Sequence, residues 1–339
     1  MEKNGVLVMD ISVKEFQHIS EADGLPLSAL RAEPEDAAEV CGAAIIVHGM
    51  CEHKGRYEPF VRFLAERGYI VTIFDQRGHG GSVRDPEDLG YLYEGGYQAM
   101  LSDIHGMVIA AKAYACERTG RTDLPFAMIA HSMGTLCARC YLREHDDEID
   151  KLVLLGCPSK ATGAKAGLAL VKGLIATRGD RARSKTVDFI VGGGFEKAFA
   201  KEHTQYAWTN SDPEQVRLYN EDPLCGYHFT LNGYKALIEM MILTYTEGGF
   251  TPRNKDLPIR FFSGADDPCA ISKQKLGEAI RCLRKQGYQN TKGKRYPGMR
   301  HEILRERGKE TVWNDILAFL QTDGTPIAGA DANGKCDAE

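Results

Sequence analysis

An alternation of short apolar runs with longer helical segments constrains the fold of this chain most strongly. The apolar runs predict strands at AAIIVHG (43–49), YIVTIFD (69–75), FAMIA (126–130), KLVLLG (151–156), PIRFFSG (258–264) and KRYPG (294–298). Helical spacing predicts helices at 56–67, 97–118, 134–145, 231–246, 272–286 and 302–321. Strands that are apolar on both faces and separated by helices form a parallel sheet with helices on both sides. The sequence therefore predicts an α/β protein with a mostly parallel, doubly wound sheet.

Two segments depart from this alternation. The N-terminal stretch VKEFQHISEADGLPLSALRAEP predicts an antiparallel hairpin that turns at Asp23-Gly24. Residues 158–229 have helical patterns but no convincing strand. We therefore expect a core built from 1–157 and 230–321, interrupted by a helical cap or lid at 158–229. The small, polar residues 322–339 predict a disordered tail.

The segment AHSMG (130–134) places Ser132 between a predicted strand and a predicted helix. A nucleophilic serine on a strained strand-to-helix turn has this context, with the pattern Gly-x-Ser-x-Gly. Here Ala130 stands in place of the first glycine, and Gly134 keeps the second. The motif alone also fits an ordinary serine near a helix start, so the rest of the chain has to distinguish the two.

A nucleophilic serine needs a base and an acid that orients the base. In this kind of sheet the chain order is serine, acid, histidine, each after a strand. Asp266 and Asp267 follow the strand at 258–264, and His301 follows the last one. We expect Asp267 to be the acid, although either aspartate is also a suitable cap for the next helix.

The loop after the first parallel strand usually supplies a second donor to an oxyanion hole. The backbone amides of Met50 and Met133 are therefore the expected oxyanion donors. His48 is expected to hydrogen-bond the loop as a structural residue. The glycine-rich turn DQRGHGGS lacks the ending of a phosphate-binding loop, so Arg77 and His79 are also expected to be structural.

Charge and composition exclude several functions. The net charge is −5, which gives no general case for nucleic-acid binding. No run approaches the ~20 apolar residues of a membrane-spanning helix, and the N-terminus lacks signal-peptide features. The ten cysteines are scattered, which suits a reducing cytoplasm. We expect Cys137 and Cys140 to be packing thiols, and we expect no metal or organic cofactor.

The predicted cap has an amphipathic and basic segment. Helical spacing gives it a candidate apolar face at Leu168, Val171, Leu174 and Ile175. Residues 160–185 have one acidic residue, Asp180, and seven basic ones: Lys160, Lys165, Lys172, Arg178, Arg181, Arg183 and Lys185. This pattern is typical of a lid that makes transient contact with an anionic lipid surface, on the inner face of a membrane, or of a solvated cap face.

Three features of the cap remain open at this stage. Gly192–Gly194 is expected to be a hinge or a loop. Trp208 and Tyr219 are candidates to line a pocket, although aromatic residues in a cap also serve as packing.

Six blocks in the expected order resemble the monoacylglycerol lipase and lysophospholipase group, α/β-hydrolases of the serine aminopeptidase-like branch. They are VHGMCEHKGRYEPF (47–60), FDQRGHGGS (74–82), AHSMG (130–134), DPEQVRLYNEDPLCG (212–226), SGADDP (263–268) and YPGMRHE (296–302). The resemblance runs from about residue 11 to 321 and implies an α/β-hydrolase fold. The blocks are specific for the fold and triad but only weakly specific for the substrate.

The resemblance also implies functional residues. It places the catalytic serine, acid and histidine at Ser132, Asp267 and His301 and the oxyanion donors at Met50 and Met133. The chain departs from the family pattern twice: Cys51 replaces the second glycine of His-Gly-x-Gly-Glu-His, and Ala130 replaces the first glycine of the elbow. Both substitutions are expected to affect the oxyanion hole more than the reaction class.

The sequence thus predicts a serine hydrolase that cleaves the carboxylic ester of a monoacyl lipid, either a monoacylglycerol or a lysophospholipid. The same triad also suits short-chain esters, thioesters or a peptide-like amide. A third alternative, an inactive binding protein on a hydrolase scaffold, is disfavoured because Ser132, Asp267 and His301 are all present.

Overall fold

The sheet of the protein has eight strands, as seen in a computed structural model that describes residues 2–3, 6–7, 9–270 and 272–322. Their order across the sheet is β10-β9-β8-β7-β5-β6-β4-β3. The strands are β3 (Ile11–Ile19), β4 (Pro26–Pro34), β5 (Gly42–Val47), β6 (Tyr69–Phe74), β7 (Phe126–His131), β8 (Lys151–Leu155), β9 (Ile259–Gly264) and β10 (Thr291–Tyr296). Strands β10 to β6 are parallel, whereas β4 is antiparallel to both β6 and β3. The predicted sheet and its N-terminal hairpin are confirmed.

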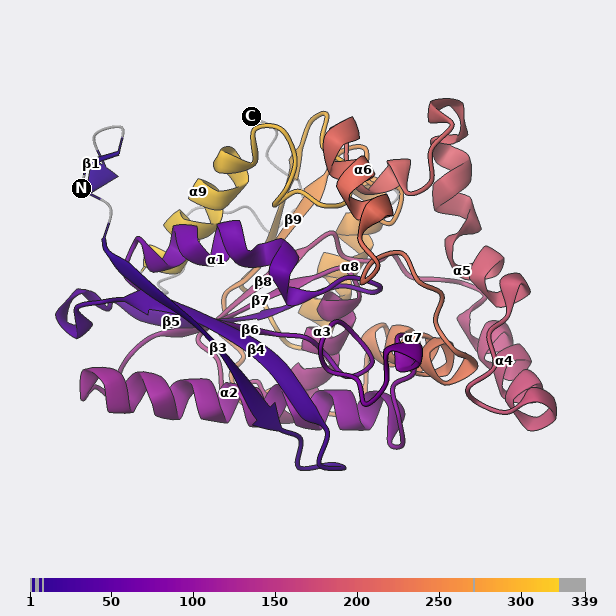
Figure 1. Cartoon of the computed structure of the whole chain (residues 1–339), viewed down its shortest axis with the longest axis horizontal. Helices are drawn as coiled ribbons and strands as arrows, with labels where there is room; N and C mark the ends of the chain where they lie inside the picture. Colours follow the sequence, from indigo (N-terminus) through magenta and orange to yellow (C-terminus); the bar gives the residue numbers. More distant parts are fainter. Residues whose placement is uncertain (1, 4–5, 8, 271, 323–339) are drawn as a thin grey trace.

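Helices cover both faces of this sheet. They are α1 (Glu58–Ala65), α2 (Gly96–Thr119), α3 (Met133–His145), α4 (Ala164–Arg178), α5 (Lys185–Ala198), α6 (Pro213–Glu221), α7 (Leu231–Thr244), α8 (Lys273–Lys285) and α9 (Lys309–Gln321). In Figure 1, α1 and α9 lie on one side of the sheet and α2 on the other, while α4 and α5 project beyond it at the right. None of the helices in the described residues is long and apolar enough to span a membrane.

The alternating side chains of the central strands build two cores. Ala43, Ile45 and Val47 of β5 point into a cluster formed with α2, α3, α7 and α8. Ala44 and Ile46 point to the opposite face, into a cluster formed with α1 and α9. A strand that is buried on both faces needs an apolar residue at every position, which explains why the strand pattern is continuous rather than alternating.

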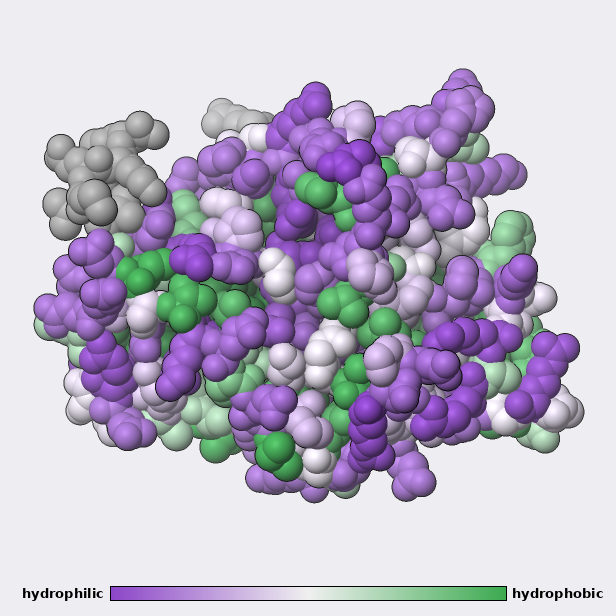
Figure 2. All heavy atoms as spheres, viewed as in Figure 1, coloured by the Kyte–Doolittle hydropathy of each residue, from purple (hydrophilic) through white to green (hydrophobic). Residues whose placement is uncertain are grey.

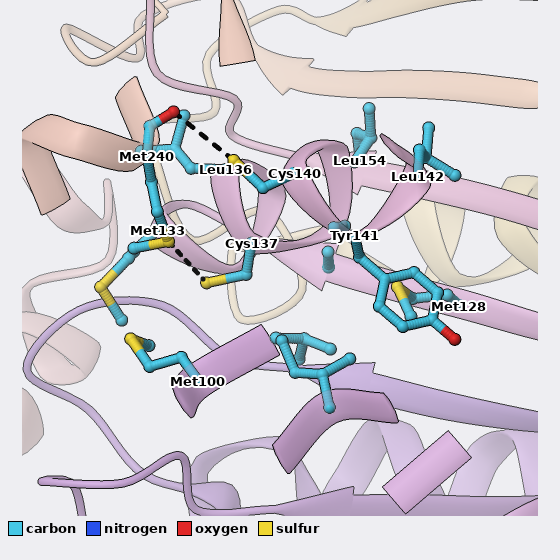
Figure 3. Packing of buried hydrophobic residues seen from close by; sticks show 14 of the residues in the cluster. Met100, Met128, Met133, Leu136, Cys137, Cys140, Tyr141, Leu142, Leu154 and Met240 are labelled. Carbon is cyan, nitrogen blue, oxygen red and sulfur yellow. Dashed lines mark hydrogen bonds between the residues drawn. The ribbon is translucent and has the colours of Figure 1, made fainter. Parts of the chain in front are cut away.

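The Cys137-x-x-Cys140 spacing belongs to the first of these cores. The two thiols lie one turn apart on α3 and face Met240 of α7 (Figure 3). The Sγ atom of Cys137 lies 3.5 Å from the Met240 sulfur, and the Sγ atom of Cys140 lies 3.6 Å from its carbonyl oxygen. Burial raises the pKa of Cys140 to about 11. The pair therefore consists of packing thiols, as expected.

The structure corrects two expectations about local elements. Gly192–Gly194 lies inside α5, so this segment is neither a hinge loop nor a break. The side chain of Ser184 caps that helix at its start by accepting a hydrogen bond from the amide of Val187. Three glycines cost about 1 kcal/mol each relative to alanine in a helix interior, so the cap and the tertiary contacts outweigh that cost.

The last helix begins at Lys309 and not at residue 302. Long-range hydrogen bonds hold the preceding segment as a loop. The amide of Glu302 donates to the carbonyl of Thr209 at 2.7 Å. The carboxylate of Glu306 accepts from the amide of Arg300 at 2.7 Å and from the amide of Ser211 at 2.9 Å. These bonds compete successfully with the helical pattern of the sequence.

Thr322 is the last residue that the structure describes. The rest of the segment that the sequence predicts to be disordered, 323–339, lies outside the described residues.

Candidate active site

Ser132 lies at the junction of β7 and α3, and its backbone is strained. Its φ of 51° and ψ of −119° are unusual for a residue with a side chain. Such strain is typical of functional turns. A Cβ atom on Gly134 would lie 2.3 Å from the carbonyl oxygen of Val47, so only glycine fits where the helix crosses β5. The turn therefore holds the Ser132 hydroxyl at the carboxyl edge of the sheet.

The structure brings Ser132, His301 and Asp267 together from three separate loops. The Nε2 atom of His301 lies 2.8 Å from the Oγ atom of Ser132. The Nδ1 atom of His301 lies 3.0 Å from the Oδ2 atom of Asp267, whose Oδ1 accepts the amide of Cys269 at 2.8 Å. Asp267 is buried, whereas Asp266 is exposed. The imidazole thus connects the hydroxyl to Asp267 and not to its neighbour.

Met50 and Met133 both line the cavity beside Ser132. Among the described residues, neither backbone amide has a hydrogen-bond acceptor. Met133 is the first residue of α3, and the amides of a first helical turn have no partner within the helix. Both N–H groups are therefore available to a ligand.

The two substituted glycine positions have different surroundings. Cys51 lines the cavity and adopts a φ of 55°, a conformation that glycine adopts more easily. Its thiol donates to the carbonyl of Tyr227 at 2.8 Å. Ala130 is fully buried in the core between β5 and β8 and does not line the cavity. The expectation that Ala130 affects the oxyanion hole is therefore wrong, because its methyl group faces the core.

His48, Arg77 and His79 support the loops around the site. The Nδ1 atom of His48 donates to the carbonyl of Gly49 at 2.8 Å, and its Nε2 accepts the amide of Gln76 at 2.9 Å. Arg77 is buried and pairs with Asp103 at 2.7 Å. Burial lowers the pKa of His79 to about 3. All three act as scaffold residues.

A cavity of about 1100 Å³ opens above Ser132, between the sheet edge and helices α4, α5 and α7. Small-molecule sites commonly measure about 300–1,000 Å³, so this cavity is large. Much of its wall is apolar, including Leu136, Leu170, Val191, Ile238 and Met241.

Trp208 and Tyr219 both line this cavity, as the sequence suggested. The ring of Trp208 lies 5.0 Å from the ring of His301, and its Nε1 donates to Glu196 at 3.0 Å. The hydroxyl of Tyr219 donates to the carbonyl of Cys51 at 2.9 Å. Both aromatic side chains are thus fixed close to the reactive groups.

Asp188 of α5 is a lining residue that the sequence analysis missed. One oxygen lies 3.1 Å from the Nδ1 atom of His228. The other, Oδ1, is buried without a hydrogen-bond partner among the described residues. Tyr206, Tyr227 and Tyr234 line the same end of the cavity. No local motif marks Asp188, because its significance depends on the folding of α5 over Ser132.

The sequence analysis also missed a buried polar cluster behind Ser132. The carboxylate of Glu52 accepts the amide of Gly49 at 2.5 Å and the hydroxyl of Tyr57 at 2.7 Å. It also contacts the Nδ1 atom of His131 at 3.0 Å. Burial raises the pKa of Glu52, but hydrogen bonding and charge from His131 more than offset it, so this pKa is far below its ordinary value. The position of His131, next to Ser132 in the sequence, is the signal that could have revealed this cluster.

One group of side chains has the atoms of a metal site. Ligand atoms of His53, Asp222 and Cys225 lie within 4.8 Å of one another. However, the amide of Gly55 donates to the Nδ1 atom of His53 at 3.2 Å, so the Nε2 atom has the proton and donates to Asp222. The guanidinium of Arg56 also lies 3.8 Å from the Cys225 sulfur. A hydrogen-bonded pair fits this arrangement better than a bound cation.

A mostly parallel sheet with helices on both faces, and a serine on a strained turn after a central strand, define an α/β-hydrolase. Residues 38–308 match the family described as serine aminopeptidase, S33. The chain therefore belongs to this family of hydrolases, and the resemblance inferred from the sequence is confirmed.

Similar proteins include lipases and esterases. The monoacylglycerol lipase of Mycolicibacterium smegmatis is 25% identical over 287 residues, which cover 82% of this chain and 88% of the relative. The phospholipase YtpA of Bacillus subtilis is 22% identical and covers 81% of this chain and 93% of its own length. The crystal structure of a carboxyl esterase from Bacillus coagulans superposes with a TM-score of 0.80, at 25% identity, over 91% of this chain and 98% of that one.

Proposed function

We propose that this hydrolase cleaves the carboxylic ester of neutral monoacyl lipids, with Ser132 as nucleophile, His301 as base and Asp267 as the orienting acid. The observation that carries the proposal is the continuous path of hydrogen bonds from Asp267 through His301 to Ser132, at 3.0 and 2.8 Å, at the floor of a large cavity. The similarity to a monoacylglycerol lipase and to a carboxyl esterase supports it.

The geometry supports the following mechanism. His301 takes the proton of the Ser132 hydroxyl as its oxygen attacks the ester carbonyl. Asp267 fixes the tautomer of the imidazole and stabilises the imidazolium that forms. The amides of Met50 and Met133 stabilise the oxyanion, and losing one such donor typically costs about 10²–10³ in kcat. The alcohol leaves with the proton of His301, and water then cleaves the acyl-enzyme with His301 as base.

Asp188 favours a neutral alcohol over a phosphate-bearing one where it lines the cavity, while Lys160 and Lys275 are also among the lining residues. The carboxyl oxygens of Asp188 are hydrogen-bond acceptors. A glycerol hydroxyl can donate to its unpaired Oδ1, whereas a phosphodiester would place a second negative charge close to it. The tyrosines around Asp188 add further hydroxyl groups to this end. We therefore infer that monoacylglycerols are preferred over lysophospholipids.

A second candidate, hydrolysis of short-chain esters, is favoured by the similarity to the carboxyl esterase. The size of the cavity argues for longer acyl chains, because a short ester leaves most of an apolar wall of this extent uncovered. Thioesters and amides share the same triad chemistry.

A substrate profile tests the proposal. We expect kcat/KM to be highest for monoacylglycerols with a long acyl chain, and lower for p-nitrophenyl acetate and for lysophosphatidylglycerol. Asp188→Asn is expected to lower kcat/KM for monoacylglycerols about tenfold or more, because a hydrogen bond to a charged acceptor contributes about 1.5–3 kcal/mol. With lysophosphatidylglycerol, the kcat/KM of the same variant should fall by a smaller factor or should rise.

Asp147→Asn is the matched control, because Asp147 is exposed and pairs with Arg253 away from the cavity. It should leave the profile unchanged. A maximum at the acetate ester would contradict the lipid preference, and equal losses for both lipid classes in Asp188→Asn would contradict the role of its charge.

We further propose that residues 158–229 form a cap over the core at 1–157 and 230–321, and that the cap makes transient contact with anionic lipid surfaces. Leu170 on α4 and Phe189 and Ile190 on α5 are exposed and also line the cavity. The edge of the molecule where α4 and α5 lie has hydrophobic residues among hydrophilic ones (Figure 2).

The seven basic residues of 160–185 divide into two groups. Three of them bind the core: Arg181 pairs with Asp88, Lys172 with Glu239, and Arg183 donates to two backbone carbonyls. Four make no ion pair with the described residues, namely Lys160, Lys165, Arg178 and Lys185. These four remain available to an anionic surface, and a simply solvated cap face is the alternative.

Vesicle binding distinguishes a cap that contacts anionic lipid surfaces from a cap face that is simply solvated. We expect cosedimentation with vesicles of phosphatidylcholine and phosphatidylglycerol to exceed that with phosphatidylcholine alone. Phe189→Ser should reduce it several-fold, because a buried aromatic side chain contributes about 1.5–3 kcal/mol. Ile19→Ser, at an exposed position on β3, is the matched control. Equal and weak binding by all variants would support the solvated face.

A further inference from the structure

A cluster of buried charges lies directly behind the Ser132 turn. The guanidinium of Arg56 bonds both oxygens of Glu302 at 2.6 Å and lies 3.5 Å from the second carboxylate, Glu52. All three side chains are almost completely buried. Two buried carboxylates thus face one guanidinium. Because an uncompensated buried charge is costly, the cluster favours further positive charge. Arg305 lines the same small pocket, and the charges of Glu302 and Glu52 act on its guanidinium, although it forms no ion pair with either carboxylate among the described residues.

His131 lies where this further positive charge is favoured, and both of its ring nitrogens face acceptors. The Nε2 atom lies 3.2 Å from the carbonyl oxygen of His301, which can only accept a hydrogen bond. The Nδ1 atom lies 3.0 Å from the Glu52 carboxylate. An imidazole that donates from both nitrogens is doubly protonated, so the two acceptors point to an imidazolium.

The remaining neighbours of His131 agree with this state. Tyr57 lies 2.8 Å from the Nδ1 atom and has one proton, which it donates to Glu52 at 2.7 Å. Arg305 donates to the carbonyl of Arg56 and to Gln215, and among the described residues it forms no ion pair. His48, on the other side of Glu52, accepts a backbone amide and is neutral. Asp267 is engaged by His301.

We propose that His131, the residue before the proposed nucleophile, is a charged positioning residue that ties the catalytic base to the oxyanion loop. Its Nε2–H holds the carbonyl of His301. Its Nδ1–H holds Glu52, which in turn holds the amide of Gly49, next to Met50. The inference rests on the proposed function, in which His301 and Met50 act together in the transition state.

The charge of His131 also lies close to the base. The rings of His131 and His301 lie 4.8 Å apart. The charged ring of His131 therefore lies beside the imidazole of the proposed base. Burial lowers the pKa of His131, but the hydrogen bond and charge of Glu52 more than offset it, so this pKa lies above its ordinary value.

The first test is the steady-state kinetics of His131→Gln, measured on a monoacylglycerol. The loss of the two tethers should lower kcat about 10–100-fold with little change in KM, because the groups that His131 positions act in the transition state. His105→Gln, at a histidine that stacks on His145 away from the cavity, is the matched control and should change neither quantity.

The second test uses the wild-type protein and needs neither activity nor a folded variant. Long-range ¹H–¹⁵N correlation spectra of ¹⁵N-histidine-labelled protein should show one histidine protonated on both nitrogens at about pH 8, well above the ordinary histidine pKa of about 6.5. If this signal is absent from the spectrum of folded His131→Gln, it belongs to His131.

A wild-type spectrum in which every histidine is neutral at that pH would overturn the inference. An unchanged kcat in a folded His131→Gln would do the same while leaving the proposed function intact. Absence of any esterase activity in the wild type would instead count against the proposed function, and the spectrum would still decide the charge of His131.

Discussion

Replacing Ser132 by alanine is expected to lower kcat for ester hydrolysis about 10⁵-fold or more and to abolish labelling by a fluorophosphonate probe. The nucleophile and the base act as one unit, so that removing the serine forfeits nearly all of the triad's contribution. About 10³–10⁴-fold catalysis over water should remain from the oxyanion donors and from binding. Stopped assays with a monoacylglycerol, together with gel-based labelling, measure both quantities.

The turn itself should tolerate this change, since alanine keeps the Cβ atom. The melting temperature should therefore stay close to that of the wild type. Ser102→Ala, on helix α2, is the matched control and should label and hydrolyse normally. Labelling that persists in Ser132→Ala would show that another residue is the nucleophile.

Replacing Asp267 by asparagine should have the second largest effect, a loss of about 10⁴-fold in kcat. The side-chain amide of the new asparagine can donate a hydrogen bond to the Nδ1 atom of His301. The imidazole proton would then lie on Nε2, and a protonated Nε2 atom cannot accept the proton of Ser132. The expected signature is a fall in kcat with KM nearly unchanged. Steady-state kinetics near neutral pH measure both.

The adjacent aspartate offers an unusually close control. The side chain of Asp266 is exposed, and only its backbone amide is described as donating a hydrogen bond, to the carbonyl of Met299. Asp266→Asn should therefore retain most of the activity. If Asp266→Asn proved as inactive as Asp267→Asn, the orienting acid would be misassigned.

The sequence was sufficient for the sheet and for naming three side chains that the structure brings together. Continuous apolar runs such as β5 are recognisable because both faces of the strand are buried. Ser132, Asp267 and His301 were found because each follows a predicted strand, and the carboxyl ends of parallel strands share one edge. Asp266 and Asp267 follow the same strand, so the sequence favours one of them as the acid only weakly. The contact between Asp267 and the imidazole of His301 distinguishes them.

Other features depend on tertiary contacts that no local pattern reveals. The glycines at 192–194 signal a break, yet α5 continues through them. The segment after His301 has helical spacing, yet Glu302 and Glu306 bind distant backbone groups. The charge of His131 is equally invisible in sequence, because it follows from two acceptors contributed by Glu52 and by the carbonyl of His301.

The hydrogen bonds between the His301 loop and residues 207–211 have a consequence for engineering chimaeric enzymes. Arg300 donates to the carbonyls of Ala207 and Asn210 at 2.5 and 3.1 Å, and Glu306 binds Ser211. A graft that exchanged all of 158–229 would also remove the partners that shape this loop. Breakpoints placed before Glu196 would exchange α4 and most of α5 while keeping Glu196, the partner of Trp208, and the segment that shapes the loop of the proposed base.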